Sequence, residues 1–147
     1  MIKSTVCYLV HDEKWLMLLR NKKQHDLNHG KWIGVGGKLK TNETPYECMV
    51  REVIEETGYQ VQSALYCGII HFHYEHHEDE EIYVYQTSDY VGTLHECSEG
   101  TLAYIPKKDI LDLELWEGDR IFLEKMFRNE VPFSIRLYYD ENEILIK

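Results

Sequence analysis

Short apolar stretches separated by polar or charged turns recur along most of this chain, a pattern typical of a protein rich in β-strands. The first two, Val6–Val10 and Trp15–Arg20, flank a polar turn and predict neighbouring strands. A polar loop and then a glycine-rich stretch, Gly34 to Gly37, follow, where the backbone bends or allows a close approach. Further strands are expected at Leu65–Tyr74, Glu81–Thr87, Gly100–Ile105 and Phe133–Tyr139, the last paired with Ile144–Ile146 in a terminal hairpin.

The clearest helix has readable signals at both ends. Thr44 is a good N-cap, Pro45 suits the first helical position, and Glu47 completes a capping box. Gly58 is the expected stop. The core side of this helix is expected to consist of Tyr46, Met49, Val50, Val53 and Thr57.

A second helix is expected at Asp119–Asn129. Its apolar face would be formed by Phe122, Leu123, Met126 and Phe127. Strands interrupted by two main helices predict the α/β class, with a mixed β-sheet between helices.

Three carboxylates of the first helix stand at spacings at which they should repel one another. Glu52, Glu55 and Glu56 share one helical face, and like charges so placed cost about 0.2–0.5 kcal/mol per pair. Either solvent screens these charges or a cation binds them. Hard divalent ions such as Mg²⁺ take oxygen ligands and commonly join protein carboxylates to substrate phosphates.

These glutamates lie in a longer pattern that resembles the signature of the Nudix hydrolases. It runs from Gly37 through Glu43 and Arg51-Glu52 to Gly58, with Tyr59 at a final position that is usually aliphatic. Three further segments, Lys31–Lys38, Glu99–Thr101 and Trp116–Asp119, are similar to the MutT-type 8-oxo-dGTP diphosphatases, as is the stretch from Phe133.

The resemblance implies a Nudix-type α/β/α sandwich and hydrolysis of a nucleoside triphosphate to its monophosphate and pyrophosphate. The implied cofactor is Mg²⁺, with Mn²⁺ as a substitute, and the favoured substrate is 8-oxo-dGTP. Glu52 or Glu55 would act as general base, with Arg51 orienting a carboxylate and Glu43 supporting it. The implied metal ligands are Glu52, Glu55, Glu56, Glu99 and the main-chain carbonyl of Gly36. Two alternatives stay open: Arg51 could form only a surface pair with Glu47, and Glu99 could be an exposed loop charge.

The resemblance also implies a substrate site. Trp116 would stack on the base and Asp119 would hydrogen-bond its edge, although Trp116 could instead pack in the core and Asp119 cap the second helix. Ile33 stands where some relatives have a polar residue that reads the base, and a single acid follows Gly118 where eukaryotic relatives have a pair. The candidates for binding the phosphate tail are Lys38, Arg20 and Lys23.

Composition narrows the remaining possibilities. The 147 residues suggest a single domain, 1–147, and a net charge of −10 argues against a polymeric nucleic acid as partner. No stretch approaches the ~20 apolar residues of a membrane span. Four cysteines without CxxC spacing suggest free thiols, and we expect a cytoplasmic protein. For the histidines at 71, 73, 76 and 77 a structural or solvated role is favoured over a metal cluster.

Two other functions are compatible with the sequence. One is a Nudix enzyme for ADP-ribose, a dinucleoside polyphosphate or a capped RNA end. The absence of proline between Pro45 and Pro106 argues against the ADP-ribose group, whose marker proline lies shortly after the signature. The other is a non-catalytic nucleotide sensor, although such domains usually lose carboxylates that this chain retains. Oligomeric state is not predicted.

Overall fold

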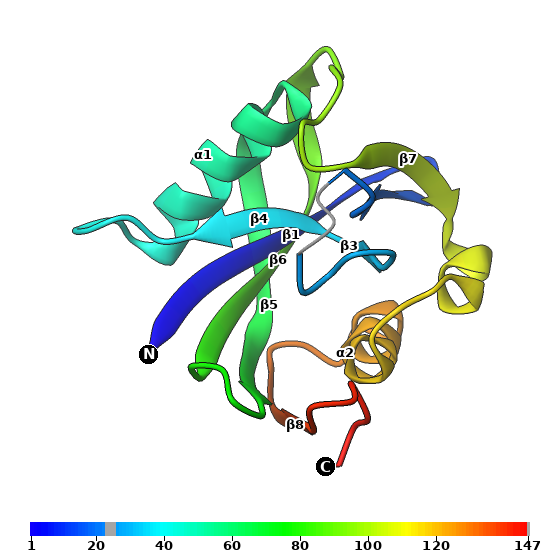
Figure 1. The fold of residues 1–147 in the computed structure, drawn as a ribbon. Coiled ribbons are helices and arrows are strands. Elements are labelled where there is room, and N and C mark those ends of the chain that lie inside the picture. Colours follow the sequence, from blue (N-terminus) through cyan, green and yellow to red (C-terminus); the bar gives the residue numbers. More distant parts are fainter. Residues whose placement is uncertain (23–25, 147) are drawn as a thin grey trace.

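The computed structural model describes residues 1–22 and 26–146. The elements follow one another from strands into a first helix, a long strand pair and a second helix (Figure 1). They are β1 (Ile2–His11), β2 (Lys14–Leu19), β3 (Trp32–Ile33), β4 (Val35–Lys38), α1 (Pro45–Thr57), β5 (Tyr59–Tyr74), β6 (Glu80–Gly92), β7 (Thr101–Pro106), the 3₁₀ helix η1 (Lys107–Asp112), α2 (Glu117–Phe127) and β8 (Phe133–Tyr139).

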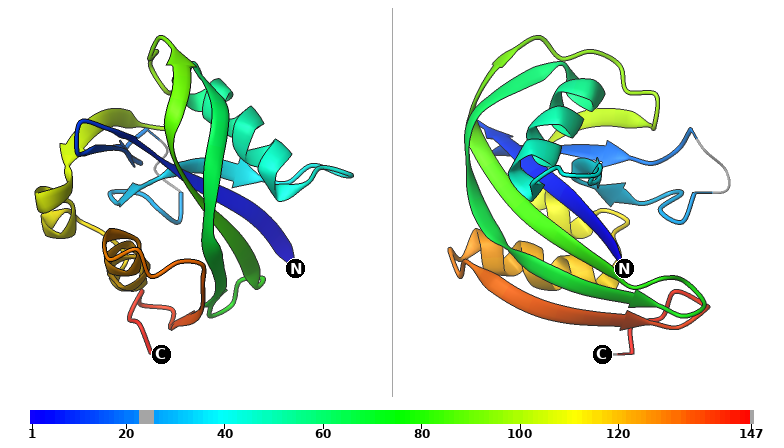
Figure 2. Two further views of the ribbon diagram at one scale, coloured as in Figure 1. Left: turned by 180° about the vertical axis from the view of Figure 1, so that it is seen from behind. Right: turned by 90° about the vertical axis from the view of Figure 1, so that its left-hand side faces the viewer.

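The strands form a mixed sheet in the order β3-β2-β1-β6-β5-β8, with β4 paired to β1 and β7 paired to β2. The β1–β6 and β5–β8 pairs are parallel, and the other pairs are antiparallel. Helices α1 and α2 lie on opposite sides of this sheet, as the views from front, back and side agree (Figures 1 and 2). The expected α/β fold with a mixed sheet between helices is confirmed.

Alternation along the first two strands builds a core on each side of the sheet. Leu9 of β1 and Leu16 of β2 belong to the cluster that includes Met49 and Val53 of α1. Their neighbours point the other way, so that Tyr8 packs in the cluster under α2. Burial of large apolar side chains at about 25 cal/mol per Å² on both faces holds the three layers together. Among the residues with described structure, no helix is long and apolar enough to cross a membrane.

The expected ends of α1 are confirmed, and its buried face differs from the expected one. Thr44 accepts a hydrogen bond from the N–H of Glu47, whose carboxylate accepts one from the N–H of Thr44, and Gly58 has the left-handed φ of 89°. Tyr46, expected in the core, is 39% exposed. Glu56, which was not expected in the core, is buried near the other end of the helix, because α1 turns its carboxylate toward β4.

The second helix begins two residues earlier than expected, and the expected cap is wrong. Its N-cap position is Trp116, without a side-chain cap, and Asp119 lies inside the first turn. The N–H of Gly118 instead donates to the hydroxyl of Tyr139 at 2.6 Å. A Cβ on Gly118 would lie 2.5 Å from Leu137 and 2.7 Å from that hydroxyl, so glycine lets α2 begin directly against β8.

One strand prediction needs correction and another needs completion. Strand β5 begins at Tyr59 rather than at Leu65. Irregularities in its pairing with β6 between residues 61 and 68 disrupt the period-two pattern, so the sequence did not show the first part of the strand. Strand β8 pairs along its length with β5, a partner that the sequence did not indicate, in addition to the expected terminal hairpin. The hairpin forms through the bridge between Tyr139 and Leu145, and the N–H of Ile146 donates to the carbonyl of Tyr138 at 2.7 Å.

Candidate metal and nucleotide site

Two glycines of β4 bring the strand against the glutamates of α1. A Cβ on Gly37 would lie 2.4 Å from the carboxyl carbon of Glu52, and one on Gly36 would lie 1.9 Å from the carbonyl oxygen of Thr5. Position 36 therefore requires glycine, because its neighbour is main chain, whereas a side chain at position 37 would displace the carboxylate of Glu52. The local sequence thus places the carboxylate of Glu52 directly beside the main chain of β4.

Arg51 is the centre of the ion-pair network on this face. Its guanidinium binds Glu43 through two hydrogen bonds, of 2.7 and 2.9 Å, and donates to Glu52 at 2.6 Å and to Glu55 at 3.4 Å. A further bond reaches the carbonyl of Lys38 at 3.1 Å. Hydrogen bonds from Arg51 lower the pKa of Glu43 to about 2. The alternative of a surface pair with Glu47 is wrong, since Glu47 is engaged in the capping box.

Glu56 is a buried carboxylate with one oxygen that lacks a hydrogen-bond partner. Its side chain is 9% exposed, and Oε1 accepts a long hydrogen bond of 3.3 Å from the N–H of Gly36. The other oxygen, Oε2, is buried with no hydrogen-bond partner. Burial, with repulsion from Glu52, raises the pKa of Glu56 to about 8. A buried acceptor without a partner costs about 1–3 kcal/mol, and a cation would supply the missing partner.

Glu99 and Arg20 form an ion pair whose charges act on this carboxylate. Arg20 lies 2.8 Å from Asp26 and 3.1 Å from Glu99, and the charges of Arg20 and Glu99 both act on Glu56. The alternative of Glu99 as a merely exposed charge is therefore wrong. Lys38 is exposed at the end of β4. Lys23, the third phosphate candidate, lies outside the described residues.

The metal ligands predicted from the sequence are gathered in one region but do not converge. In residues 1–22 and 26–146, no group of three His, Cys, Asp or Glu side chains is arranged to hold a metal ion. Glu52 and Glu55 turn toward Arg51 instead. The chemistry of the donor set still fits a hard divalent cation, because the unpaired oxygen of Glu56 is an anionic ligand beside the main chain of Gly36.

Trp116 is packed as a core residue. It is 4% exposed, and its ring meets those of Tyr139, Tyr74 and Phe72 edge-on, with centroid distances of 4.8, 5.9 and 6.0 Å. The indole N–H donates to the side chain of Asn28 at 2.8 Å. Packing is thus confirmed as one role of Trp116, and stacking on a base stays a prediction.

Asp119 lies in the same region, on the first turn of α2. Burial raises the pKa of its carboxyl to about 7, against the opposing effect of Lys31 and Arg120. Ile33 is half-buried in β3 and packs against the cluster that contains Trp116. One continuous stretch, residues 32–38, therefore runs from the surroundings of Trp116 to the glutamates of α1, at about 3.3 Å per residue.

Sequence reasoning missed three residues of this region. Asn28 and Tyr139 bond to Trp116 and Gly118, respectively, and Lys31 places its ammonium 4.8 Å from the centre of the Trp116 ring. Lys31 lies within a segment identified by resemblance, but no local pattern connects it with a residue 85 positions later. Only pairing across the fold reveals these contacts.

The histidines lie at the C-terminal end of β5 and in the turn after it, where His71 and His73 alternate with Phe72 and Tyr74 of the Trp116 cluster. His73 lies 2.6 Å from Asp79 and His71 lies 3.7 Å from Glu81 across the β5–β6 pair. His76 is exposed near Glu141, and the ring of His77 packs edge-on against Tyr74. These contacts agree with the favoured structural or solvated role.

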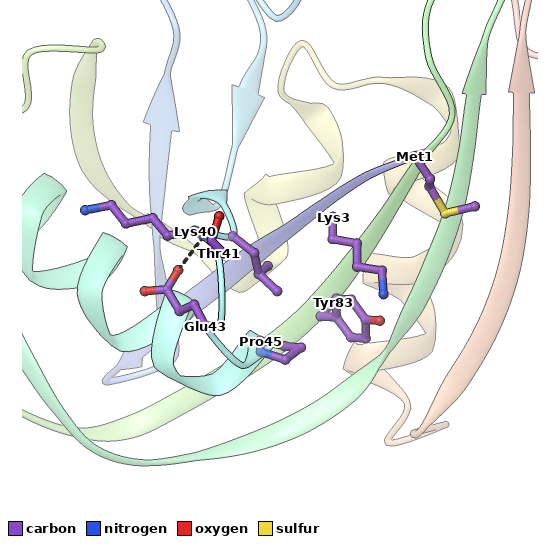
Figure 3. A pocket seen from close by; sticks show the side chains of 8 residues that line it. Met1, Lys3, Lys40, Thr41, Glu43, Pro45 and Tyr83 are labelled. Atoms are coloured by element: carbon purple, nitrogen blue, oxygen red, sulfur yellow. Dashed lines mark hydrogen bonds between the residues drawn. The ribbon is translucent and has the colours of Figure 1, made fainter.

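A separate hollow of about 430 Å³ opens where the start of α1 meets β1 and β6 (Figure 3). Lys3 and Tyr83 of the two strands lie across from Glu43, which accepts a hydrogen bond from the N–H of Lys40 at 2.9 Å. Glu52, Glu55 and Glu56 do not line this hollow. It adjoins the Arg51 network only through Glu43.

Comparisons with known proteins agree with this geometry. The chain is 28% identical to "Uncharacterized Nudix hydrolase YvcI" of Bacillus subtilis over 87% of this chain and 80% of that protein. It is 26% identical to the oxidized purine nucleoside triphosphate hydrolase of Danio rerio, over 77% and 73% of the two chains. The fold matches the crystal structure of the mMutator MutT protein from Bacillus halodurans with a TM-score of 0.90 at 21% identity, covering 100% and 95%. Because the NUDIX domain matches residues 1–126, the chain belongs to the Nudix family.

Proposed function

We propose that this protein hydrolyses nucleoside triphosphates to monophosphate and pyrophosphate with the aid of a divalent cation, and that 8-oxo-dGTP is its preferred substrate. The observation that carries the proposal is the buried, unpartnered carboxylate oxygen of Glu56, beside the glycine main chain of β4 and four residues from Glu52. Burial of this ionised oxygen without a partner is unfavourable, and a bound cation would offset that cost.

The family supports the reaction class. Nudix hydrolases cleave diphosphate bonds in small nucleotide substrates and generally use divalent metal ions. Here Glu56, Glu52 and the main chain of Gly36 would hold Mg²⁺ or Mn²⁺, with Glu55 and Glu99 as further carboxylates. When bound, such an ion screens phosphate oxygens and lowers the pKa of water.

The protein's own side chains would then position and deprotonate the attacking water. Glu52 and Glu55 are the two candidates for general base, and they differ in environment. Glu52 is 17% exposed and tied to Arg51 at 2.6 Å, whereas Glu55 is 54% exposed with a bond of 3.4 Å. Arg51 would orient these carboxylates, since a guanidinium remains charged and cannot accept a proton.

The preference for an oxidised purine is supported by the surroundings of Trp116. An aromatic ring and the carboxyl of Asp119, near one end of the stretch 32–38 that leads to the glutamates, suit a purine base with a hydrogen-bonding edge. The relatives from Danio rerio and Mus musculus, at 26% and 23% identity, are both named oxidized purine nucleoside triphosphate hydrolases. Lys38 and Arg20 remain the described candidates for the phosphate tail.

A product-release assay on a substrate panel tests the proposal. The panel contains 8-oxo-dGTP, dGTP, dATP, ADP-ribose, a dinucleoside polyphosphate and a capped RNA, each with Mg²⁺, with Mn²⁺ and with EDTA. We expect the highest kcat/KM with 8-oxo-dGTP, release of pyrophosphate, and no turnover in EDTA. Full activity in chelator would refute the metal-dependent reaction. A higher kcat/KM with ADP-ribose, the dinucleoside polyphosphate or the capped RNA would refute 8-oxo-dGTP as the preferred substrate.

A further inference from the structure

The ammonium of Lys31 lies between two partners from distant parts of the chain. It is 4.8 Å from the centre of the Trp116 ring and 3.2 Å from Oε1 of Glu143, in the turn that follows β8. The main chain of Lys31 is fixed by hydrogen bonds with Asn28 at 2.9 Å and with Arg20 at 3.0 Å. The loop is therefore anchored, while the long side chain can change direction.

The side chain of Lys31 covers Trp116 and is held there by weak contacts. The three described aromatic neighbours of the indole meet it at interplanar angles of 72 to 88°, so none of these three rings stacks parallel to it. Tyr74 and Tyr139 are core residues. The side chains of Lys31 and Glu143 are 19% and 45% exposed, and an ion pair of this kind contributes only about 0.2–1 kcal/mol.

The same ammonium acts on Asp119, whose carboxyl it makes more acidic against the effect of burial. The ammonium over the Trp116 ring and the carboxyl of Asp119, three residues after Trp116 on the first turn of α2, thus supply one donor and one acceptor. An ammonium has three N–H donors and no acceptor. This acceptor and this donor complement a purine that carries a ring N–H near a carbonyl oxygen. Adenine has no carbonyl oxygen that could accept a hydrogen bond from the ammonium.

We propose that Lys31 is a specificity-determining residue of the nucleotide site: a purine base displaces its ammonium from Trp116, and the ammonium then donates a hydrogen bond to a carbonyl oxygen of the base. The inference rests on the proposed function and deepens it, because it explains how keto purines are distinguished from adenine. Glu143 holds the ammonium in place until the base arrives.

Binding of product nucleotides tests this role separately from catalysis. Dissociation constants for 8-oxo-dGMP, dGMP and dAMP are measured by calorimetry on the wild type, on Lys31→Met and on Lys31→Gln. Met keeps the apolar stem without the charge, and Gln keeps a neutral donor. Lys14→Met, on an exposed lysine at the start of β2, is the matched control.

Lys31→Met is expected to bind 8-oxo-dGMP and dGMP at least ~10-fold more weakly, since a hydrogen bond from a charged group contributes about 1.5–3 kcal/mol. Lys31→Gln, which keeps a neutral donor, should weaken the same two nucleotides by a smaller factor. Binding of dAMP should stay within ~2-fold of the wild type, because adenine has no carbonyl oxygen that accepts a hydrogen bond from Lys31. Lys14→Met should match the wild type throughout, and thermal melting verifies that each variant is folded.

The outcomes separate this inference from the proposed function. If both Lys31 variants change the binding of all three nucleotides equally, or retain the wild-type preference, Lys31 does not read the base and the inference is overturned alone. The same loss in Lys14→Met would also overturn it. If the wild type binds none of the three nucleotides, the proposed purine specificity is overturned together with it.

Discussion

In the absence of divalent metal, the stability of this protein should fall as the pH rises from about 5 to about 8, because of the carboxyl group of Glu56. The pKa of its carboxyl is raised from 4.5 to about 8 in the fold by burial and by Glu52. Between these two values the folded state holds a proton that the unfolded state has released. The contribution of Glu56 to the free energy of unfolding is then complete below pH 4.5 and decreases until the folded carboxyl has ionised, above pH 8.

The size of the effect follows from the same shift. Three to four pKa units at about 1.4 kcal/mol each correspond to roughly 5 kcal/mol, and relaxation around the buried charge reduces this to an expected 2–4 kcal/mol. Asp119, whose pKa is raised to about 7 by burial, adds a term of the same sign. Glu43, with its pKa lowered to about 2, acts only below this range.

The assay is urea unfolding of wild type and Glu56→Gln at pH 5 to 9, with EDTA or with Mg²⁺. The difference between the two proteins isolates Glu56, because Asp119 contributes equally to both. In EDTA the wild type should lose stability relative to the variant as pH rises, and Mg²⁺ should remove most of that loss by favouring the ionised carboxylate. Parallel pH profiles of the two proteins in EDTA would refute the reasoning.

Three substitutions test other parts of the site. Glu55→Gln should lower kcat with Mg²⁺ by about 10²–10⁴-fold if proton transfer depends on it, without loss of the fold; near wild-type kcat would leave Glu52 as the candidate base. Gly37→Ala should lower kcat and leave α1 folded, because the added methyl group displaces the carboxylate of Glu52, and unchanged kinetics would contradict that contact. Asp119→Ala should lower kcat/KM for 8-oxo-dGTP by roughly 5–150-fold. Since Asp119 is not the helix cap, thermal melting should show no loss of stability, and a lower melting temperature with unchanged discrimination between 8-oxo-dGTP and dGTP would contradict the assignment.

The elements that depend on nearby residues were predictable from the sequence. Thr44, Glu47 and Gly58 define α1 because capping bonds join residues three or four positions apart. The period-two pattern of β1 and β2 likewise depends only on which face of a strand each side chain occupies. Both kinds of signal are complete within about fifteen residues.

The sequence could not predict the partners of these elements. Whether Arg51 would bind Glu47 or Glu43 was undecided by spacing, since both lie within reach of a long side chain. The start of α2 depends on Tyr139, which becomes its neighbour only after β8 pairs with β5. Helical periodicity could show where its apolar face lies but not where the first turn begins.

The sequence by itself determined that this protein carries a carboxylate-rich helix with defined ends, next to glycines at fixed spacing, because those features are local. Tertiary structure decided the electrostatics of the site. It buried Glu56 against β4, aligned Glu43 with Arg51, and brought Lys31 over Trp116. A pKa and an ion pair depend on burial and distance across the fold, and these quantities exist only when strands far apart in the sequence have paired.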